Sequence, residues 1–97
     1  MMATETIERP RTGGPGAGRG GNWRVIVLND NHNTFDHVAA TLARVVPGVT
    51  LETGHRFAEQ IHNRGQAVVW TGDREAAELY WDQLNAAGLT MAPLERG

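Results

Sequence analysis

Apolar side chains are concentrated after residue 22 and are almost absent before it. Residues 23–28 are apolar at both odd and even positions, interrupted only by Arg24. Such a run predicts a strand that is buried on both faces and is therefore central in its sheet. Residues 66–71 predict a second strand and residues 89–94 a short final one. Pro93 places the final strand at an edge or an end of the sheet, because proline has no N–H to donate.

Three stretches with apolar residues at helical spacing lie between these strands and predict three helices. The expected N-caps are Asn33, Thr50 and Asp73, and the expected ends are Pro47-Gly48, Gly65 and Gly88. The expected inward residues are Phe35, Val38, Leu42 and Val45, then Leu51, Phe57, Ala58 and Ile61, then Ala77, Tyr80, Leu84 and Ala87. Gly54 weakens the second helix by ~1 kcal/mol relative to alanine. The order β-α-α-β-α-β predicts an α+β sandwich, with the helices on one face of a small sheet.

Composition divides the 97 residues into two parts. Residues 1–22 are rich in Gly, Pro and Arg and too poor in apolar side chains to fold, so we expect a disordered tail. Residues 23–97 form one small domain, for which a monomer is the default expectation. The absence of cysteine fits a cytoplasmic protein. The net charge of −2 argues against nucleic acid as a main partner, and no stretch is long enough to span a membrane.

Two polar segments about thirty residues apart carry the candidate chemistry. Asn29 and Asp30 end the first strand, and His62 lies near the end of the second helix. Together they offer an amide oxygen, a carboxylate and a neutral ring nitrogen. Apolar residues lie close by in sequence at Phe35, Val38 and Ile61. Acceptors beside an apolar pocket suit a ligand with a cationic head and a hydrophobic side chain, such as a free protein N-terminus.

The chemistry of an α-amine explains why these residue types are suitable. A protonated amine has three N–H donors, and its removal from water is costly unless each donor meets an acceptor. His62 can accept only while its imidazole is neutral, so we expect acidification to weaken binding. An acetylated amine would leave buried acceptors unpaired. The apolar pocket should grade large side chains rather than select one, since one methylene is worth only ~1–3 kcal/mol.

The combination of motifs resembles the ClpS family, adaptors of the ATP-dependent Clp protease. The shared features are the strand ending in Asn29-Asp30, the Thr/Asn-containing cap, Ile61-His62-x-x-Gly65 before a strand, and a closing Pro-Leu-Glu segment. The resemblance spans residues 23–95. It implies three antiparallel strands and three helices. It also implies binding of proteins that begin with Phe, Tyr, Trp or Leu, and their delivery to the N-terminal domain of a ClpA- or ClpC-type unfoldase, which the tail engages.

The resemblance also implies roles for individual residues. Asn29, Asp30 and His62 would hold the substrate α-amine, and Phe35, Val38, Ala58 and Ile61 would line the side-chain pocket. Asn31, Asn33 and Thr34 would form the neighbouring loop and cap, and Glu75 and Tyr80 would contact the unfoldase. Five positions depart from the family's usual residues: Asn31 for an acid, Asn33 for Thr, Phe35 and Ala58 for Met, and Tyr80 for a basic residue. Because Phe is stiffer and Ala smaller than Met, we expect a shifted preference among Leu, Phe, Tyr and Trp.

Other interpretations of the same residues remain open. Asn29-Asp30 is also typical of loop and capping chemistry, and His62 of a charge partner for a helix C-terminus. The fold also suits a docking or assembly module, akin to the C-terminal domain of the ribosomal stalk protein. An enzyme using His62 and Asp30 is disfavoured, because there is no cysteine, serine nucleophile turn or cofactor fingerprint. The histidine spacings of five and seven residues do not favour a metal site.

Overall fold

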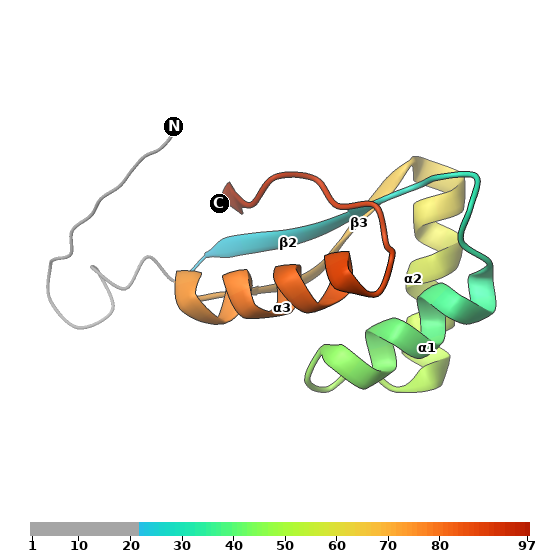
Figure 1. Cartoon of the computed structure of the whole chain (residues 1–97), viewed down its shortest axis with the longest axis horizontal. Coiled ribbons are helices and arrows are strands. Elements are labelled where there is room, and N and C mark those ends of the chain that lie inside the picture. Colours follow the sequence, from blue (N-terminus) through green and yellow to red (C-terminus); the bar gives the residue numbers. More distant parts are fainter. Residues whose placement is uncertain (1–21) are drawn as a thin grey trace, which may run out of the picture.

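The computed structural model describes residues 22–97, so the predicted tail lies almost wholly outside it. The elements are β2 (Trp23–Leu28), α1 (Phe35–Val45), α2 (Leu51–Arg64), β3 (Gln66–Gly72), α3 (Arg74–Ala86) and β4 (Glu95–Arg96) (Figure 1). This sequence of elements confirms the predicted order β-α-α-β-α-β. No helix within residues 22–97 is long and apolar enough to cross a membrane.

The sheet has the order β3-β2-β4, with both pairings antiparallel, so β2 is central as predicted. Val25, Ile26 and Val27 are all buried, which confirms that β2 is covered on both faces. The main core lies on one face of the sheet. It is formed by alternating β2 and β3 residues with residues from all three helices: Val25, Val27, Ala67 and Val69 with Val38, Leu42, Val45, Ala58, Ile61, Ala77 and Leu84. The predicted arrangement, with the helices on one side of the sheet, is therefore confirmed.

The final strand is shorter and later than the predicted residues 89–94. In that range only Met91 forms a β-bridge, with Val27, and β4 begins at Glu95. Pro93 has no N–H and cannot continue a ladder beside β2, so regular pairing resumes only after it. The segment still follows the edge of β2, because the Ala92 N–H donates to the Ile26 carbonyl at 3.1 Å.

Thr50 and Asp73 cap α2 and α3 as predicted, and Gly65 ends α2 at a φ of 90°. The cap of α1 is Thr34 rather than Asn33, because the Thr34 hydroxyl accepts from the His37 N–H at 3.0 Å. The side chain of Asn33 is engaged in other hydrogen bonds, described below. Leu51 was expected inward but is 54% exposed, since the buried face of α2 begins one turn later, at Gly54.

Helices α1 and α2 cross in close contact, and the crossing lies beside the end of β2 (Figure 1). Gly54 is buried against the backbone of α1. A Cβ added there would lie 2.5 Å from the carbonyl oxygen of Ala39. The glycine that weakens α2 as an isolated helix therefore permits its contact with α1.

Candidate functional site

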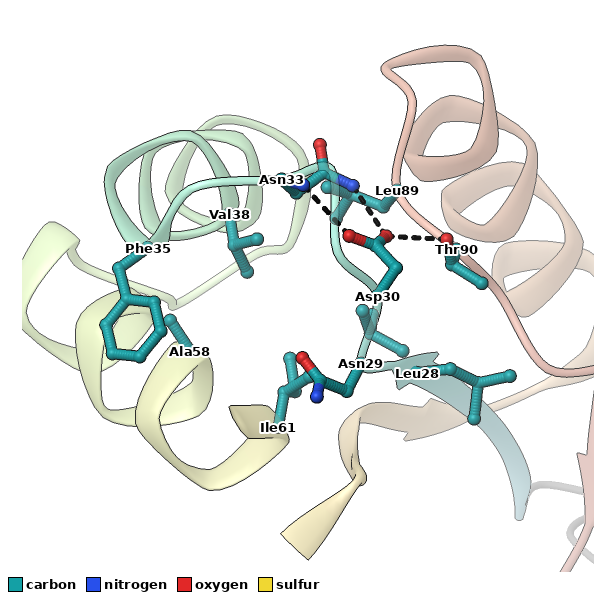
Figure 2. A pocket seen from close by; sticks show the side chains of 11 residues that line it. Leu28, Asn29, Asp30, Asn33, Phe35, Val38, Ala58, Ile61, Leu89 and Thr90 are labelled. Carbon is teal, nitrogen blue, oxygen red and sulfur yellow. Dashed lines mark hydrogen bonds between the residues drawn. The ribbon is translucent and has the colours of Figure 1, made fainter. Parts of the chain in front are cut away.

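A narrow hollow, open to solvent, lies where β2 ends. It is bounded by the β2–α1 loop, by α1 and α2, and by the segment that follows α3 (Figure 2). The residues that line it are Val27, Leu28, Asn29, Asp30, Asn33, Phe35, Val38, Ala58, Ile61, Leu89 and Thr90. Most of the predicted amine-binding and side-chain-binding residues are thus brought together in one pocket.

Two backbone hydrogen bonds fix the end of β2 between distant segments. The Leu28 N–H donates to the Thr90 carbonyl at 2.8 Å, and the Asn29 N–H donates to the Gly65 carbonyl at 2.9 Å. The second bond places Asn29 at the C-terminal end of α2. The side-chain amide of Asn29 makes no hydrogen bond within residues 22–97, and Figure 2 shows it beside Ile61 at the pocket. Among the described residues, no donor is bonded to the amide oxygen of Asn29.

Asp30 is the centre of a hydrogen-bond network on the polar wall of the pocket. Its Oδ1 accepts from the backbone N–H groups of His32 and Asn33 at 2.8 and 2.9 Å. Its Oδ2 accepts from the Asn33 Nδ2 at 2.8 Å and from the Thr90 hydroxyl at 2.6 Å. These donors, the Thr90 hydroxyl first and the Asn33 N–H second, hold the pKa of the Asp30 carboxyl well below its usual range. Asp30 is thus ionised, with a fixed orientation, at the pocket.

The pH dependence of stability provides a test of this network. Asp30→Asn is expected to lower the free energy of unfolding at neutral pH by about 1–2 kcal/mol, because charge-assisted hydrogen bonds are lost. A carboxyl whose folded pKa is depressed stabilises the fold above its ordinary pKa of about 4, and this contribution is lost as pH falls toward the folded value. The difference between wild type and variant should therefore shrink below about pH 4. Urea unfolding at pH 7 and pH 3 measures it, with exposed Asp82→Asn as the control. A difference that is the same at both pH values would contradict the network.

The apolar wall of the pocket comes from α1 and α2. Val38, Ala58 and Ile61 are buried, whereas Phe35 stands at the rim with 42% of its surface exposed. Phe35 was expected inward, but as the first residue of α1 it lies at the mouth of the pocket. Its ring meets the exposed His62 ring edge to face, with the centroids 5.2 Å apart. His62 does not line the pocket itself, and contact with Phe35 places it beside the entrance.

The remaining predicted site residues occupy two places. Asn33 lines the pocket, Thr34 caps α1, and Asn31 is exposed in the loop between them and Asp30. Glu75 and Tyr80 lie on α3, outside the pocket. Glu75 is exposed in the first turn, and Tyr80 is half-buried with its ring 5.0 Å from that of Trp70.

Sequence reasoning missed Leu89 and Thr90, which the expected final strand included only as structural residues. Gly88 ends α3 at a φ of 97° and turns the chain, so that Leu89 is buried and Thr90 reaches Asp30. An apolar residue directly after the C-terminal glycine of a helix commonly packs back onto the helix. That signal was available for Leu89, but none indicated the distant partner of Thr90.

The histidines do not gather in one place. His55 lies 3.8 Å from the Asp36 carboxylate, and the Nε2 of His37 lies 3.0 Å from the Ala87 carbonyl oxygen. Within residues 22–97, no three His, Asp or Glu side chains are grouped closely enough to hold a metal ion.

The fold is a small α+β domain, and its pocket places the ionised, hydrogen-bonded Asp30 beside an apolar wall. Residues 19–95 match the family described as "ATP-dependent Clp protease adaptor protein ClpS", and the chain belongs to this family. The family is one of protease adaptors. The predicted resemblance is therefore confirmed.

Individual relatives agree with this assignment. The chain is 55% identical over 74 residues to the ATP-dependent Clp protease adapter proteins ClpS of Thermosynechococcus vestitus and of a Nostoc species, covering 76% of this chain and 79% and 76% of theirs. The chloroplastic adapter CLPS1 of Arabidopsis thaliana is 36% identical over 67 residues, which are 69% of this chain and 42% of that protein. The solved structure of Agrobacterium tumefaciens ClpS2 bound to L-phenylalaninamide superposes with a TM-score of 0.71. Its identity to this chain is 27%, covering 81% of this chain and all of that one.

Proposed function

We propose that the chain is a non-enzymatic adaptor that binds proteins by a free N-terminal residue with a large hydrophobic side chain and delivers them to a Clp unfoldase. The observation that carries this proposal is the pocket at the end of β2, where an ionised, fully hydrogen-bonded Asp30 faces an apolar wall. One wall suits an ammonium group and the other an aromatic or branched side chain. An N-terminal residue carries both groups on the same carbon atom.

In this proposal, the amine is received at the mouth of the pocket. The amide oxygen of Asn29 and a ring nitrogen of His62 accept two of its hydrogen bonds, since neither residue is committed to the Asp30 network. Asp30 supplies the negative potential. Both of its oxygens already accept two hydrogen bonds each, so contact with the amine is expected mainly through charge and through water. L-Phenylalaninamide, the ligand of the Agrobacterium protein, has a free amine of this kind next to a phenyl side chain.

The side chain of the first residue would enter between Val38, Ala58 and Ile61, beneath Phe35. Because Ala58 is small and buried, it leaves more room at this wall than a longer side chain would. We therefore expect aromatic first residues to be accepted, with a graded preference among Phe, Tyr, Trp and Leu. Phe35 borders the space that they fill and would close over them.

Delivery requires a second surface, and we assign it to α3. Glu75 is exposed on this helix outside the pocket, and Tyr80 is partly exposed on the same element. A bound substrate would thus leave these residues accessible to the N-terminal domain of a ClpA- or ClpC-type unfoldase.

A series of peptides that differ only in their first residue tests the proposal. Peptides that begin with Phe, Tyr, Trp or Leu are expected to bind at least tenfold more tightly than the twin beginning with Gly, because a buried large side chain contributes about 1.5–3 kcal/mol. Fluorescence anisotropy measures the affinity. Delivery is tested by the degradation rate of a Phe-initiated reporter by a ClpC-type unfoldase and its protease, with and without this protein. Equal affinity for all first residues would refute the binding proposal, and an unchanged degradation rate would refute delivery by that unfoldase.

A further inference from the structure

The four donors to the Asp30 carboxylate differ in origin. Three come from His32 and Asn33, two and three positions along the same loop. Such local bonds shape the loop but move with it. The fourth donor, the Thr90 hydroxyl, lies sixty positions away in the segment after α3 and makes the shortest bond, at 2.6 Å. Thr90 therefore ties the carboxylate to the rest of the domain.

Thr90 is itself fixed by contacts that do not involve Asp30. Its carbonyl accepts from the Leu28 N–H at 2.8 Å, which aligns it with the end of β2. The preceding Leu89 is buried, and the carbonyl of Gly88 accepts from the Asn33 Nδ2 at 3.0 Å. The hydroxyl is thus presented from an anchored segment. Figure 2 shows it on the wall of the pocket opposite Phe35.

We propose that Thr90 is a positioning residue for ligand binding: its hydroxyl holds the Asp30 carboxylate, and through it the Asn29-Asp30 loop, in the orientation that receives an α-amine. The inference rests on the proposed function, since it assigns a role in recognition of the amine. Loss of the hydroxyl leaves Oδ2 with one donor fewer and lets the carboxylate rotate. The ligand must then restrict the carboxylate again as it binds, which lowers the affinity. A preorganised site avoids this loss of conformational freedom when its ligand enters.

The test uses the full chain with Thr90→Val, which keeps the shape of the side chain and removes the hydroxyl, and with Thr90→Ser, which restores the hydroxyl. Thr71→Val is the matched control, because Thr71 is an exposed threonine on β3 that does not line the pocket. Anisotropy is measured with a peptide that begins with a free Phe and with its N-acetylated twin. We expect Thr90→Val to weaken binding of the free peptide about three- to tenfold. Thr90→Ser and Thr71→Val should stay within about twofold of wild type.

A second readout separates this role from a general loosening of the fold. The titration of the Asp30 carboxyl, followed by carbon NMR without peptide, should show a higher pKa in Thr90→Val than in wild type and recovery in Thr90→Ser. The inference would be overturned if Thr90→Val matched wild type both in its affinity for the free peptide and in the pKa of its Asp30 carboxyl. If wild type itself does not prefer the free amine, the proposed function fails, and the titration still decides whether Thr90 controls the carboxylate.

Discussion

Acetylation of the N-terminal amine is expected to lower the affinity of a Phe-initiated peptide at least about 100-fold. The acetyl group removes the positive charge that Asp30 attracts and two of the three N–H donors. A bound peptide would also cover the exposed side chains of Asn29 and His62, and acetylation would leave their acceptors without partners. A site built to hydrogen-bond a group discriminates strongly against ligands that lack it, because its polar atoms are then unpaired.

Anisotropy with the free and acetylated peptides measures this effect. Asn29→Ala and His62→Ala should each weaken binding of the free peptide at least about tenfold and reduce the discrimination between the two peptides. His55→Ala is the matched control, since it removes another histidine from α2 that does not line the pocket. Equal binding of both peptides by wild type would contradict recognition of the amine and favour a docking module that ignores the chemistry of the N-terminus.

Gly54→Ala is expected to destabilise the protein by about 2 kcal/mol, although it should stabilise an isolated helix. Helix propensity favours alanine over glycine by about 1 kcal/mol. The added Cβ, however, would lie 2.5 Å from the Ala39 carbonyl oxygen, and the neighbouring atoms belong to the backbone of α1. Backbone cannot move aside as a flexible side chain does, so the helices must separate and lose contact.

Urea unfolding of Gly54→Ala measures this effect, and Gln60→Ala, at an exposed position of the same helix, is the control. The melting temperature should fall by roughly 10 °C, since 1 kcal/mol corresponds to about 4–8 °C for a domain of this size. Peptide affinity should fall as well, because the apolar wall of the pocket is built jointly by Val38 on α1 and Ala58 on α2. Separation of the two helices would therefore disrupt it. A variant that is more stable than wild type would show that the crossing of α1 and α2 tolerates separation.

Two glycines, one within α2 and one that caps it, show where the local sequence is sufficient to predict the role of a residue and where it is not. Gly65 was predicted to end the second helix, and it does so in the left-handed conformation, because the requirement for positive φ is local. Gly54 was interpreted only as a residue that weakens the helix. Glycine is needed there because a side chain would collide with the carbonyl group of Ala39 on α1, a contact that the local sequence does not reveal. Likewise Asn33 was a reasonable cap by residue type, but Thr34 caps α1 because Asn33 is bonded to Asp30 and Gly88.

The sequence by itself determined the order of the elements and the central position of β2. These follow from hydrophobic periodicity and from capping chemistry, which act over a few neighbouring residues. Only the tertiary structure decided that Thr90 closes the polar wall, that Phe35 stands at the rim against His62, and that the last strand is delayed beyond Pro93. Each of these depends on a contact between segments far apart in the chain. Such contacts are set by how the packed elements meet, which residue types and local spacing do not specify.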